Sequence, residues 1–424
     1  MRKQTPKRLL FLAVCILAGL HTLSDATPSH VQVVKTVTGW RLLVDGKPYV
    51  VKGMCYYPTK VGESPNDGNW RDWTIVDDDH DGRNDMAYQS FVDKNRNNKQ
   101  DPNEPAVGDF KLLQQLGCNT IRIYHHASAN PRVQSIYKGI DQAVLLYNHA
   151  PNKALFQDLY QTYGIRIAMG DFIGAYTGGS GAPWDPGTDY NDPQQRANML
   201  ASVEDMVTEF RNEPYLLMWI LGNENNYVFT HTNAGQFPDV YAKFVNQLAQ
   251  RIHQLDPHHP VVLCNGDIKE IKYYARYAPA IDILGVNSYP EHPFGSLWQD
   301  VAQGLGKPVL LTEFGEGKPK FIGDDIDEDY QAQRITSAWC EIDRHTAGRQ
   351  PPQNALGGFV FEWLDNWWQN WGPTIHNRGQ EGWDQEWMGL ASQGNGQLSP
   401  LLRQLRRSYF ALQAYWTGKQ TCTP

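Results

Sequence analysis

Two glutamates follow short apolar runs, each at the point where a buried strand would end. Glu224 follows the run MWILGN, and Glu313 follows PVLLT. The carboxyl ends of the strands of a parallel barrel meet at one face, where barrel active sites are built. Two carboxyl groups on opposite sides of one bond can protonate a leaving oxygen and attack an anomeric carbon. The pair therefore predicts cleavage of a glycosidic bond, and ordinary strand-end ion pairs are the structural alternative.

The segments that would position these glutamates alternate between apolar runs and helical patterns. Eight runs are expected to form strands, at residues 49–54, 120–124, 165–170, 216–221, 261–264, 283–286, 308–312 and 358–361. Helices are expected between them and after them, at residues 109–116, 154–163, 194–211, 240–255, 268–277, 297–305, 329–344 and 399–416. This alternation predicts an α/β fold of the (β/α)8 TIM-barrel type. An open doubly wound sheet is the alternative, but the sequence lacks its usual glycine-rich phosphate turn.

Three further segments complete the expected architecture. Residues 34–48 predict a small hairpin with its turn at Asp45 and Gly46, capping the bottom of the barrel. The last helix would have Ser399 as its N-cap and Pro400 at its first position. The long loops at residues 57–107 and 174–193 follow strands one and three, so both should lie on the catalytic face. The first is too long to be a simple connection.

The first long loop is acidic and contains two stretches patterned like calcium-binding turns. The first stretch offers Asp77, Asp79, Asp81 and Asp85, with Gly82 at the sharp turn and Tyr88 at the twelfth position. The second offers Asp93, Asn95, Asn97, Asp101 and Glu104, with Asn98 in the place of the glycine. Because clustered carboxylates repel one another, a structural Ca²⁺ ion is expected, with a solvated acidic loop as the alternative. No cofactor is expected for catalysis.

Five motifs, in their order along the chain, resemble those of the clan A retaining glycoside hydrolases. They are NTIRIYHH, ILGNE, DILGVNSYP, TEFG and FEWLDNWW, on the strands expected to be second, fourth, sixth, seventh and eighth. The chain is most similar to the catalytic TIM barrel of glycoside hydrolase family 2, over roughly residues 38–415, with families 5 and 72 as relatives. The resemblance implies a retaining β-glycosidase that acts by double displacement through a covalent glycosyl-enzyme.

The resemblance also implies a role for individual residues. Glu224 would be the general acid/base and Glu313 the nucleophile. Arg122 and Tyr289 would hold Glu313 in its anionic form, and Asn223 would bind the sugar 2-hydroxyl. Further substrate contacts would come from His125, Asn287 and Trp363, with Trp363 as an aromatic floor. Strand alternation would point Glu362 away from the Trp363 side, which is taken as the mouth of the barrel. Trp70, Trp73 and Trp184 would lie on the rim.

The substrate is expected to be a β-linked oligo- or polysaccharide: a β-glucan, a β-mannan or a β-galactoside. Family 2 enzymes usually carry β-sandwich domains ahead of the barrel, and few residues precede the first expected strand here. This anatomy is closer to families 5 and 72 and would suit an endo-acting enzyme. The alternatives are a β-glucan transglycosylase, a non-catalytic carbohydrate-binding barrel and a calcium-dependent adhesion protein.

The first 26 residues predict an export signal, with a basic start, an apolar stretch and small residues before a cleavage site after Ala26. Residues 27–424 would then form a single secreted or periplasmic catalytic domain, although an uncleaved anchor is the alternative. Removal of residues 1–26 changes the formal net charge from −8 to −11, because four basic side chains and one acidic one are lost. An acidic protein is a poor partner for nucleic acid or anionic membranes, whereas a neutral carbohydrate fits. The five remaining cysteines allow at most two disulfides, and their pairing and the oligomeric state stay open.

Overall fold

Eight parallel strands close into a barrel at the centre of the protein. The computed structural model describes residues 27–422 except 66, 127–151, 290–293, 371 and 379–383, so the predicted signal at residues 1–26 lies outside the described residues. The barrel strands are β4 (Val51–Cys55), β6 (Thr120–Ile123), β7 (Arg166–Asp171), β8 (Leu216–Leu221), β9 (Val261–Asn265), β10 (Ile283–Asn287), β11 (Val309–Gly315) and β14 (Ala355–Phe361). Each pairs with its neighbours in sequence order, and β14 closes the ring against β4. The predicted TIM barrel is confirmed.

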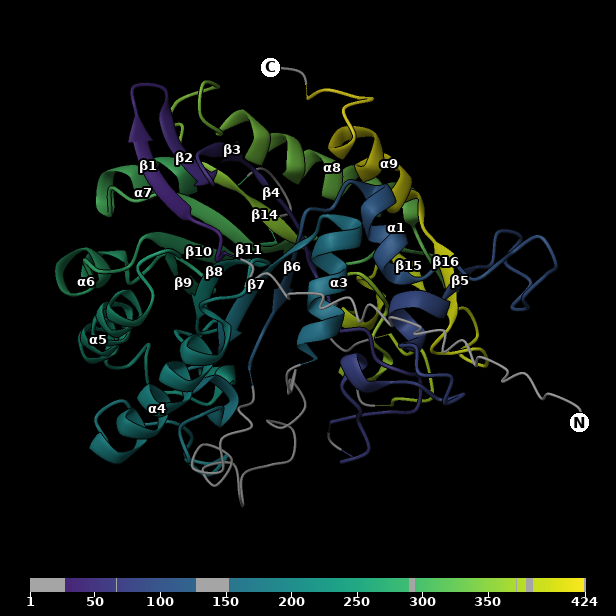
Figure 1. The fold of residues 1–424 in the computed structure, drawn as a ribbon, viewed down its shortest axis with the longest axis horizontal. Helices are drawn as coiled ribbons and strands as arrows, with labels where there is room; N and C mark the ends of the chain where they lie inside the picture. The colour runs from purple at the N-terminus through teal and green to yellow at the C-terminus, as the bar shows by residue number, and fades with distance from the viewer. Residues whose placement is uncertain are drawn as a thin grey trace, which may run out of the picture.

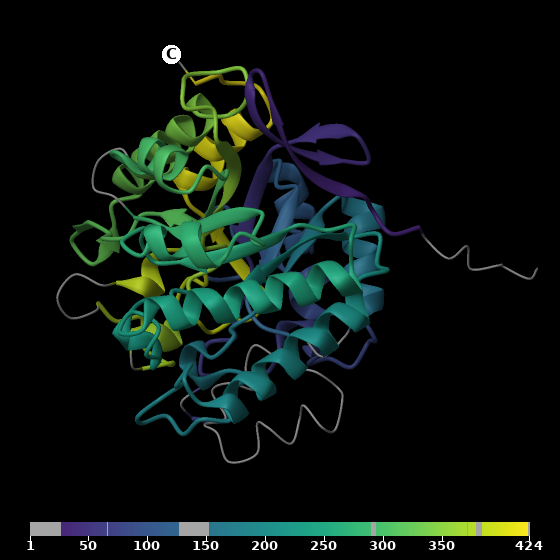
Figure 2. The same cartoon turned by 90° about the vertical axis from the view of Figure 1, so that its left-hand side faces the viewer.

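Helices surround the barrel on its outer side (Figures 1 and 2). They are α1 (Asp109–Leu116), α3 (Lys153–Tyr163), α4 (Pro193–Phe210), α5 (Pro238–Leu255), α6 (Ile271–Tyr277), α7 (Leu297–Gly304), α8 (Glu328–Arg344) and α9 (Arg407–Trp416). Helix α4 begins at Pro193 because Asp192 caps it: the Asp192 carboxylate accepts hydrogen bonds from the backbone N–H groups of Gln194 and Gln195, and proline suits the first helical position. Within the described part of the chain, no helix is long and apolar enough to cross a bilayer.

The strands form because their side chains are apolar and covered on both faces. In β8 every residue of LLMWIL is buried, with its inner face in the barrel and its outer face under the helices. Such runs are typical of parallel sheets, since crossover helices cover the sheet. Strand β8 ends at Leu221, three residues before Glu224. Glu313 lies within β11, two residues before the end of that strand. The fold therefore brings both predicted catalytic glutamates to the same face of the barrel.

The N-terminal residues form a small antiparallel sheet rather than a two-stranded hairpin. Its strands are β1 (Val31–Thr36), β2 (Gly39–Val44) and β3 (Lys47–Tyr49). The turn at Asp45 and Gly46 is where the sequence predicts it, with φ values of 50° and 76°. The Trp40 N–H donates to the Gln353 carbonyl just before β14 begins, so the sheet lies against the amino end of the barrel.

The prediction of a last helix that begins at Ser399 is wrong. Residues Leu402–Leu405 form strand β16, and the helix begins only at Arg407. Strand β16 pairs with β15 (Ala391–Ser392) and with β5 (Phe91–Val92) of the first long loop. Two arginines explain the difference: the buried Arg403 pairs with Asp109, and the buried Arg406 pairs with Asp365. These partners lie far away in the sequence, so no local pattern could indicate them.

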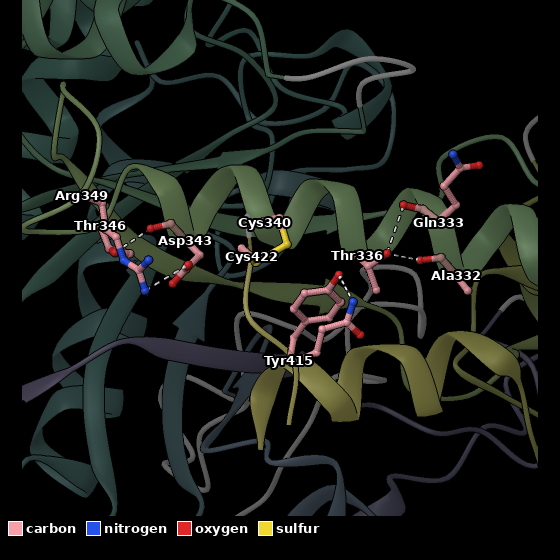
Figure 3. The surroundings of a disulfide bond; sticks show 10 residues. Ala332, Gln333, Thr336, Cys340, Asp343, Thr346, Arg349, Tyr415 and Cys422 are labelled. Carbon is pink, nitrogen blue, oxygen red and sulfur yellow. Dashed lines mark hydrogen bonds and ion pairs between the residues drawn. A yellow bond between two sulfur atoms is a disulfide. The ribbon is translucent and has the colours of Figure 1, made fainter. Parts of the chain in front are cut away.

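One disulfide ties the C-terminal end to the helical layer. Cys340 on α8 bonds to Cys422, six residues beyond the end of α9, and closes a separation of 82 residues (Figure 3). Tyr415 on α9 lies beside this bond in the same view. Cys55, Cys118 and Cys264 are free and buried. The remaining short strands, β12 (Phe321–Ile322) and β13 (Asp325–Ile326), form a hairpin before α8.

Candidate active site

Glu313 is held by three hydrogen-bond donors at the end of β11. Its Oε1 accepts from Arg122 Nη1 at 2.9 Å and from the Tyr124 hydroxyl at 2.7 Å, while its Oε2 accepts from the Tyr289 hydroxyl at 2.5 Å. Each donor stabilises the ionised carboxylate, because a charged acceptor makes stronger hydrogen bonds than a neutral one. This is the environment that a nucleophilic carboxylate needs.

Arg122 connects Glu313 to the neighbouring strands. The guanidinium is almost completely buried, and besides Glu313 it donates to the Thr312 carbonyl and, through Nη2, to Asn223 Oδ1 at 2.9 Å. Its guanidinium carbon lies 4.1 Å from the centre of the Tyr124 ring. Because a rigid guanidinium fork fixes several acceptors at once, Arg122 sets the relative positions of β6, β8 and β11.

Glu224 has different surroundings at the end of β8. Burial first and then the charge of Glu313 raise the pKa of its carboxyl, a hydrogen bond from Asn287 and the charge of Arg122 lower it, and the net pKa is about 8. A carboxylic acid with such a pKa is protonated at neutral pH and can donate its proton. The two glutamates are close enough to influence each other's ionisation, as an acid and nucleophile acting on one bond require.

The backbone at Glu224 is unusual and is fixed by its neighbour. Glu224 has a φ of 58°, in the left-handed region that residues other than glycine seldom adopt. Asn225 is completely buried and anchors this turn: its amide nitrogen donates to the Phe172 carbonyl and the Tyr190 hydroxyl, and its oxygen accepts from Asn223 N–H. Backbone conformations of this kind persist where surrounding contacts hold them, often at functional sites.

Asn223 and Asn287 link the two glutamates through an amide network. Asn287 Nδ2 donates to Asn223 Oδ1 at 3.1 Å, and its oxygen accepts from the Thr312 hydroxyl at 2.8 Å. The Asn287 side chain also hydrogen-bonds Glu224. The structure therefore brings both asparagines together with Glu224 and Arg122, and the amide nitrogen of Asn223 donates to the Tyr176 hydroxyl at 3.4 Å.

Trp363 does not lie where a sugar platform must lie. Its side chain is 1% exposed, its ring centre is 6.2 Å from that of Tyr409 on α9, and it belongs to the hydrophobic core. The ring of Phe361 is the one that faces the site, with ring centres 6.0 Å from Tyr289 and 6.1 Å from Tyr57. The predicted role of Trp363 is therefore not supported, and Phe361 is the better candidate for the aromatic floor.

Glu362 also lies on the side opposite to the one predicted. Burial raises the pKa of Glu362 well above its usual range; hydrogen bonds from Tyr57 and Asn366 oppose this shift, and the charges of Asp365 and Glu313 add to it. Tyr57, which hydrogen-bonds Glu362, packs its ring against Tyr124, whose hydroxyl donates to Glu313, so Glu362 lies on the side of the predicted site. Strand alternation failed as a guide because β14 ends at Phe361, so Glu362 and Trp363 already belong to the following turn.

His125 packs beneath the site rather than opening onto it. It is 0% exposed, its ring stacks on Phe172 at 5.1 Å, and its Nδ1 accepts from Phe172 N–H at 3.1 Å. This position favours a supporting role over the predicted substrate contact. Of the predicted rim tryptophans, Trp73 is buried in the core, Trp70 donates to the Thr59 hydroxyl, and Trp184 is exposed.

Tyr124 is the main site residue that the sequence interpretation missed. It stands two positions after Arg122 on the end of the same strand, so alternation alone would have placed both side chains on one side. Phe361, Thr312 and Cys264 were missed as well. The thiol of Cys264 donates to the Thr312 hydroxyl at 3.2 Å and lies 3.4 Å from Arg122 Nη2, which completes the layer beneath the glutamates.

The first acidic turn is held by hydrogen bonds between its carboxylates and its own backbone. Asp77, Asp79 and Asp85 bring carboxylate oxygens within 4.8 Å of one another, and Gly82 has a φ of 83°. The Asp81 N–H donates to both Asp77 and Asp79, and Asp81 in turn accepts from Arg83 N–H. Tyr88 at the twelfth position is not a ligand, because its hydroxyl donates to Asp158 on α3 at 2.6 Å.

The second acidic turn has the same pattern. Asn98, in the place of the usual glycine, has a φ of 58° and adopts the left-handed conformation expected there. Asp93 and Glu104 are buried, and each accepts backbone N–H groups of the turn, as Asn95 and Asn97 also do. Asp101 accepts from both asparagine amides. These oxygen donors suit a hard cation such as Ca²⁺.

Comparison with known proteins agrees with this geometry. Residues 93–324 match the family model of the glycosyl hydrolases family 2 TIM barrel domain. A β-glucuronidase from Paenibacillus borealis is 25% identical over 254 residues, which is 56% of this chain and 37% of that protein. A β-galactosidase from Lactococcus lactis subsp. lactis (strain IL1403) is 23% identical over 273 residues, covering 62% of this chain and 20% of that protein. The chain thus spans well under half the length of these two relatives.

Solved structures share the fold. The β-glucuronidase of Bifidobacterium dentium superposes with a TM-score of 0.55 at 18% identity, covering 92% of this chain and 49% of that one. The family 2 β-galacturonidase of Eisenbergiella tayi gives a TM-score of 0.53 at 15% identity, with coverages of 93% and 55%. Since the family model covers more than half of the sequence, the chain belongs to the family 2 TIM-barrel glycosyl hydrolases.

Proposed function

We propose that this protein is a retaining β-glycosidase, with Glu224 as general acid/base and Glu313 as nucleophile. The observation that carries the proposal is the contrast between two neighbouring carboxyl groups. Glu313 accepts three hydrogen bonds that favour its ionised form, whereas the pKa of Glu224 is raised to about 8, chiefly by burial. A protonated acid beside a carboxylate that is held by hydrogen-bond donors is what double displacement requires.

The residues perform the two steps as follows. The Glu313 carboxylate forms a bond to the anomeric carbon while the bond from that carbon to the leaving oxygen breaks, and the Glu224 proton moves to that oxygen. Glu224 is then a carboxylate and takes a proton from water, whose oxygen bonds to the anomeric carbon as the Glu313 ester breaks. Asn223 hydrogen-bonds the sugar 2-hydroxyl, and Phe361 lies under the ring.

The electrostatics of the site favour a neutral sugar over a uronic acid. Among the described charged groups, those that most affect the pKa of Glu224 are the acids Glu313 and Asp267 and one cation, Arg122. Arg122 is buried and already paired with Glu313. Lys269 is likewise paired with Asp267, so neither cation is left to bind a substrate carboxylate. A β-glucan, β-mannan or β-galactoside is therefore the preferred class, although the relatives include β-glucuronidases.

Transglycosylation is the second candidate, because it differs only in which hydroxyl attacks the glycosyl-enzyme. The exposed aromatic side chains beside Glu224, described below, favour it as an additional outcome on long substrates.

The acidic turns support a structural role for Ca²⁺. We propose that at least the second turn holds one ion through Asp93, Asn95, Asn97, Asp101 and Glu104, and that Asp77, Asp79, Asp81 and Asp85 of the first turn can hold another. Burial raises the pKa of Asp85; the Asp78 N–H opposes this, and the charges of Asp78, Asp79 and Asp77 add to it. A cation would relieve this repulsion and fix the loop on the catalytic face.

Export fits the same proposal. The N-terminal pattern predicts a secreted or periplasmic protein, and the Cys340–Cys422 bond is of a kind that persists in oxidising compartments. Polymeric carbohydrate substrates are met there.

The decisive experiment labels the nucleophile and identifies the sugar together. The protein is incubated with activated 2-fluoro β-glycosides of glucose, mannose, galactose and glucuronic acid, and its mass is measured before and after proteolysis. We expect one neutral sugar to add to the peptide that contains Glu313. Glu313→Ala should abolish labelling and turnover, whereas Glu204→Gln, at a partly exposed glutamate of α4 that pairs with Arg251, should retain both. Labelling elsewhere, or turnover by Glu313→Ala, would overturn the mechanism.

A further inference from the structure

Exposed apolar side chains follow Glu224 on the segment that leaves β8. Among the described residues, ten large hydrophobic side chains are exposed, and four of them are Trp184, Val228, Phe229 and Phe237. Two of these follow Glu224 within five residues, so the exposure is concentrated next to the acid/base. An exposed apolar patch at the edge of an active site indicates a binding surface more often than chance exposure does.

The backbone that presents these side chains is fixed by its own hydrogen bonds. The Tyr227 N–H donates to the Glu224 carbonyl at 2.8 Å, and the Thr230 hydroxyl donates to the Tyr227 carbonyl at 2.7 Å. The Thr232 hydroxyl donates to the Asn225 carbonyl at 2.6 Å. Val228 and Phe229, within the short turn Val228–Thr230, are therefore held out toward solvent while the turn around them is tied to the catalytic strand.

Tyr227 forms an aromatic pair with Phe229 next to the acid/base. Their ring centres are 5.4 Å apart. The Tyr227 ring lies so close to Gly266, just after β9, that a Cβ there would come within 1.9 Å of it. The Tyr227 hydroxyl hydrogen-bonds Asp267, and the pKa of this tyrosine is raised by burial first and then by the charges of Asp267 and Glu224. The ring is thus held beside the acid/base by packing and by a hydrogen bond.

Polar acceptors border this aromatic pair. Asp267 accepts from Asn226 Nδ2 at 2.9 Å, and Lys269 pairs with Asp267 at 2.6 Å. A second exposed ring comes from the loop after β7, where Trp184 lies 3.8 Å from His231 between ring centres. Aromatic faces next to carboxylate and amide groups match a pyranose, which has apolar C–H faces and an edge of hydroxyls.

The chemistry of the two glutamates tells which part of the substrate meets this surface. In a retaining glycosidase the acid/base lies on the leaving-group side of the anomeric carbon, and the nucleophile lies on the opposite side. We infer that Tyr227 and Phe229, with Trp184 at the outer edge, form a subsite for the sugar unit that leaves. This inference rests on the proposed function and deepens it: the leaving group is itself a carbohydrate, so the substrate is an oligo- or polysaccharide.

The test compares two substrates that share a glycone and differ in their leaving group. Laminaritriose, cellotriose, mannotriose and β-1,4-galactotriose are each paired with the β-glycosyl fluoride of their non-reducing disaccharide, whose fluoride makes no contact with the subsite. Phe229→Ala should lower kcat/KM for the cleaved trisaccharide about five- to tenfold and leave that for the fluoride within about twofold. Phe229→Trp should restore the rate on the trisaccharide, because it restores an aromatic face.

Phe410→Ala is the matched control, since Phe410 is 55% exposed on α9 against 58% for Phe229. It should change neither rate, and the melting temperatures of all three variants should equal that of the unaltered protein. An equal loss on both substrates would mean that Phe229 positions Glu224, and no loss on the trisaccharide would mean that it touches no sugar; either result overturns the subsite. If the unaltered protein cleaves neither substrate of any pair, the proposed function fails, and the subsite fails with it.

Discussion

Two chemically identical side chains acquire different roles because their partners differ. Glu313 is surrounded by Arg122, Tyr124 and Tyr289, which donate to its carboxylate. Glu224 is buried near that negative charge, so its own ionisation is disfavoured. The difference comes from donors placed on neighbouring strands, and it can be tested one residue at a time.

The pH dependence of activity should report the proton on Glu224. Its pKa of about 8 means that the acid form is present below that pH and is lost as the pH rises through it. We therefore expect kcat/KM for an oligosaccharide to fall on the alkaline side with an apparent pKa of about 8. A β-glycosyl fluoride needs no acid for its leaving group, so its kcat/KM should lack this decrease. The same alkaline decrease for both substrates would assign it to another group.

Removal of a hydroxyl that donates to Glu313 should lower activity, because the Glu313 carboxylate loses one stabilising hydrogen bond. Tyr124→Phe and Tyr289→Phe each delete one hydrogen bond to a charged acceptor, worth about 1.5–3 kcal/mol, so kcat/KM should decrease about 10- to 100-fold. Tyr49→Phe serves as the control, because its hydroxyl bonds the Asn119 carbonyl at the opposite end of the barrel. That variant should lose thermal stability and keep its kinetic constants. Unchanged kinetics in Tyr124→Phe would show that its bond to Glu313 is dispensable.

At the scale of elements, the first long loop lies on the catalytic face and contains acidic turns that could order it by binding a metal. The loop contributes β5, which pairs with β16 near the C-terminus, and one acidic turn on each side of β5. Metal binding in these turns would fix the loop against a sheet made from both ends of the chain.

Chelation should therefore lower stability. If Ca²⁺ binds with a Kd near 10 µM, 1 mM Ca²⁺ stabilises the folded protein by about 2.7 kcal/mol, which corresponds to a rise in Tm of several degrees. Differential scanning calorimetry with Ca²⁺ and with EDTA checks this. Glu104→Gln should reduce the response to Ca²⁺, whereas Asp239→Asn on the surface of α5 should keep it. A Tm that is identical in Ca²⁺ and EDTA would leave the acidic turns as solvated loops.

For the whole molecule, buried ion pairs hold the C-terminal segment against the barrel. Arg403 donates to both carboxylate oxygens of Asp109 at 2.8 Å, and both side chains are completely buried at the start of α1. Arg406 makes a similar pair with Asp365 beyond the end of β14. Together with the Cys340–Cys422 bond, these contacts attach the last twenty or so residues to distant parts of the chain.

Breaking such a pair leaves a buried charge without a partner. Arg403→Met should lower the free energy of unfolding by about 3–5 kcal/mol, as measured by urea denaturation. Lys243→Met, which breaks an exposed pair with Asp239 on α5, should leave the unfolding midpoint unchanged. Equal stability of both variants would show that the Arg403 pair contributes nothing beyond its packing.

Sequence pattern alone predicted the strands, helices and turns whose conformation depends on residues close by in the chain. The run LLMWIL is strand β8 and residues 109–116 are helix α1, both as predicted, because periodicity and caps act within a few residues. The left-handed turn at Asn98 follows for the same reason. Tertiary structure alone decided the rest. Three features depend on partners more than forty residues away. They are the side of the last barrel strand that faces the substrate, the strand that replaces the predicted helix at Arg403 and Arg406, and the hydrogen bond from Tyr124 to Glu313. Burial and pairing energies at such separations outweigh local preference, so they appear only when the chain is folded.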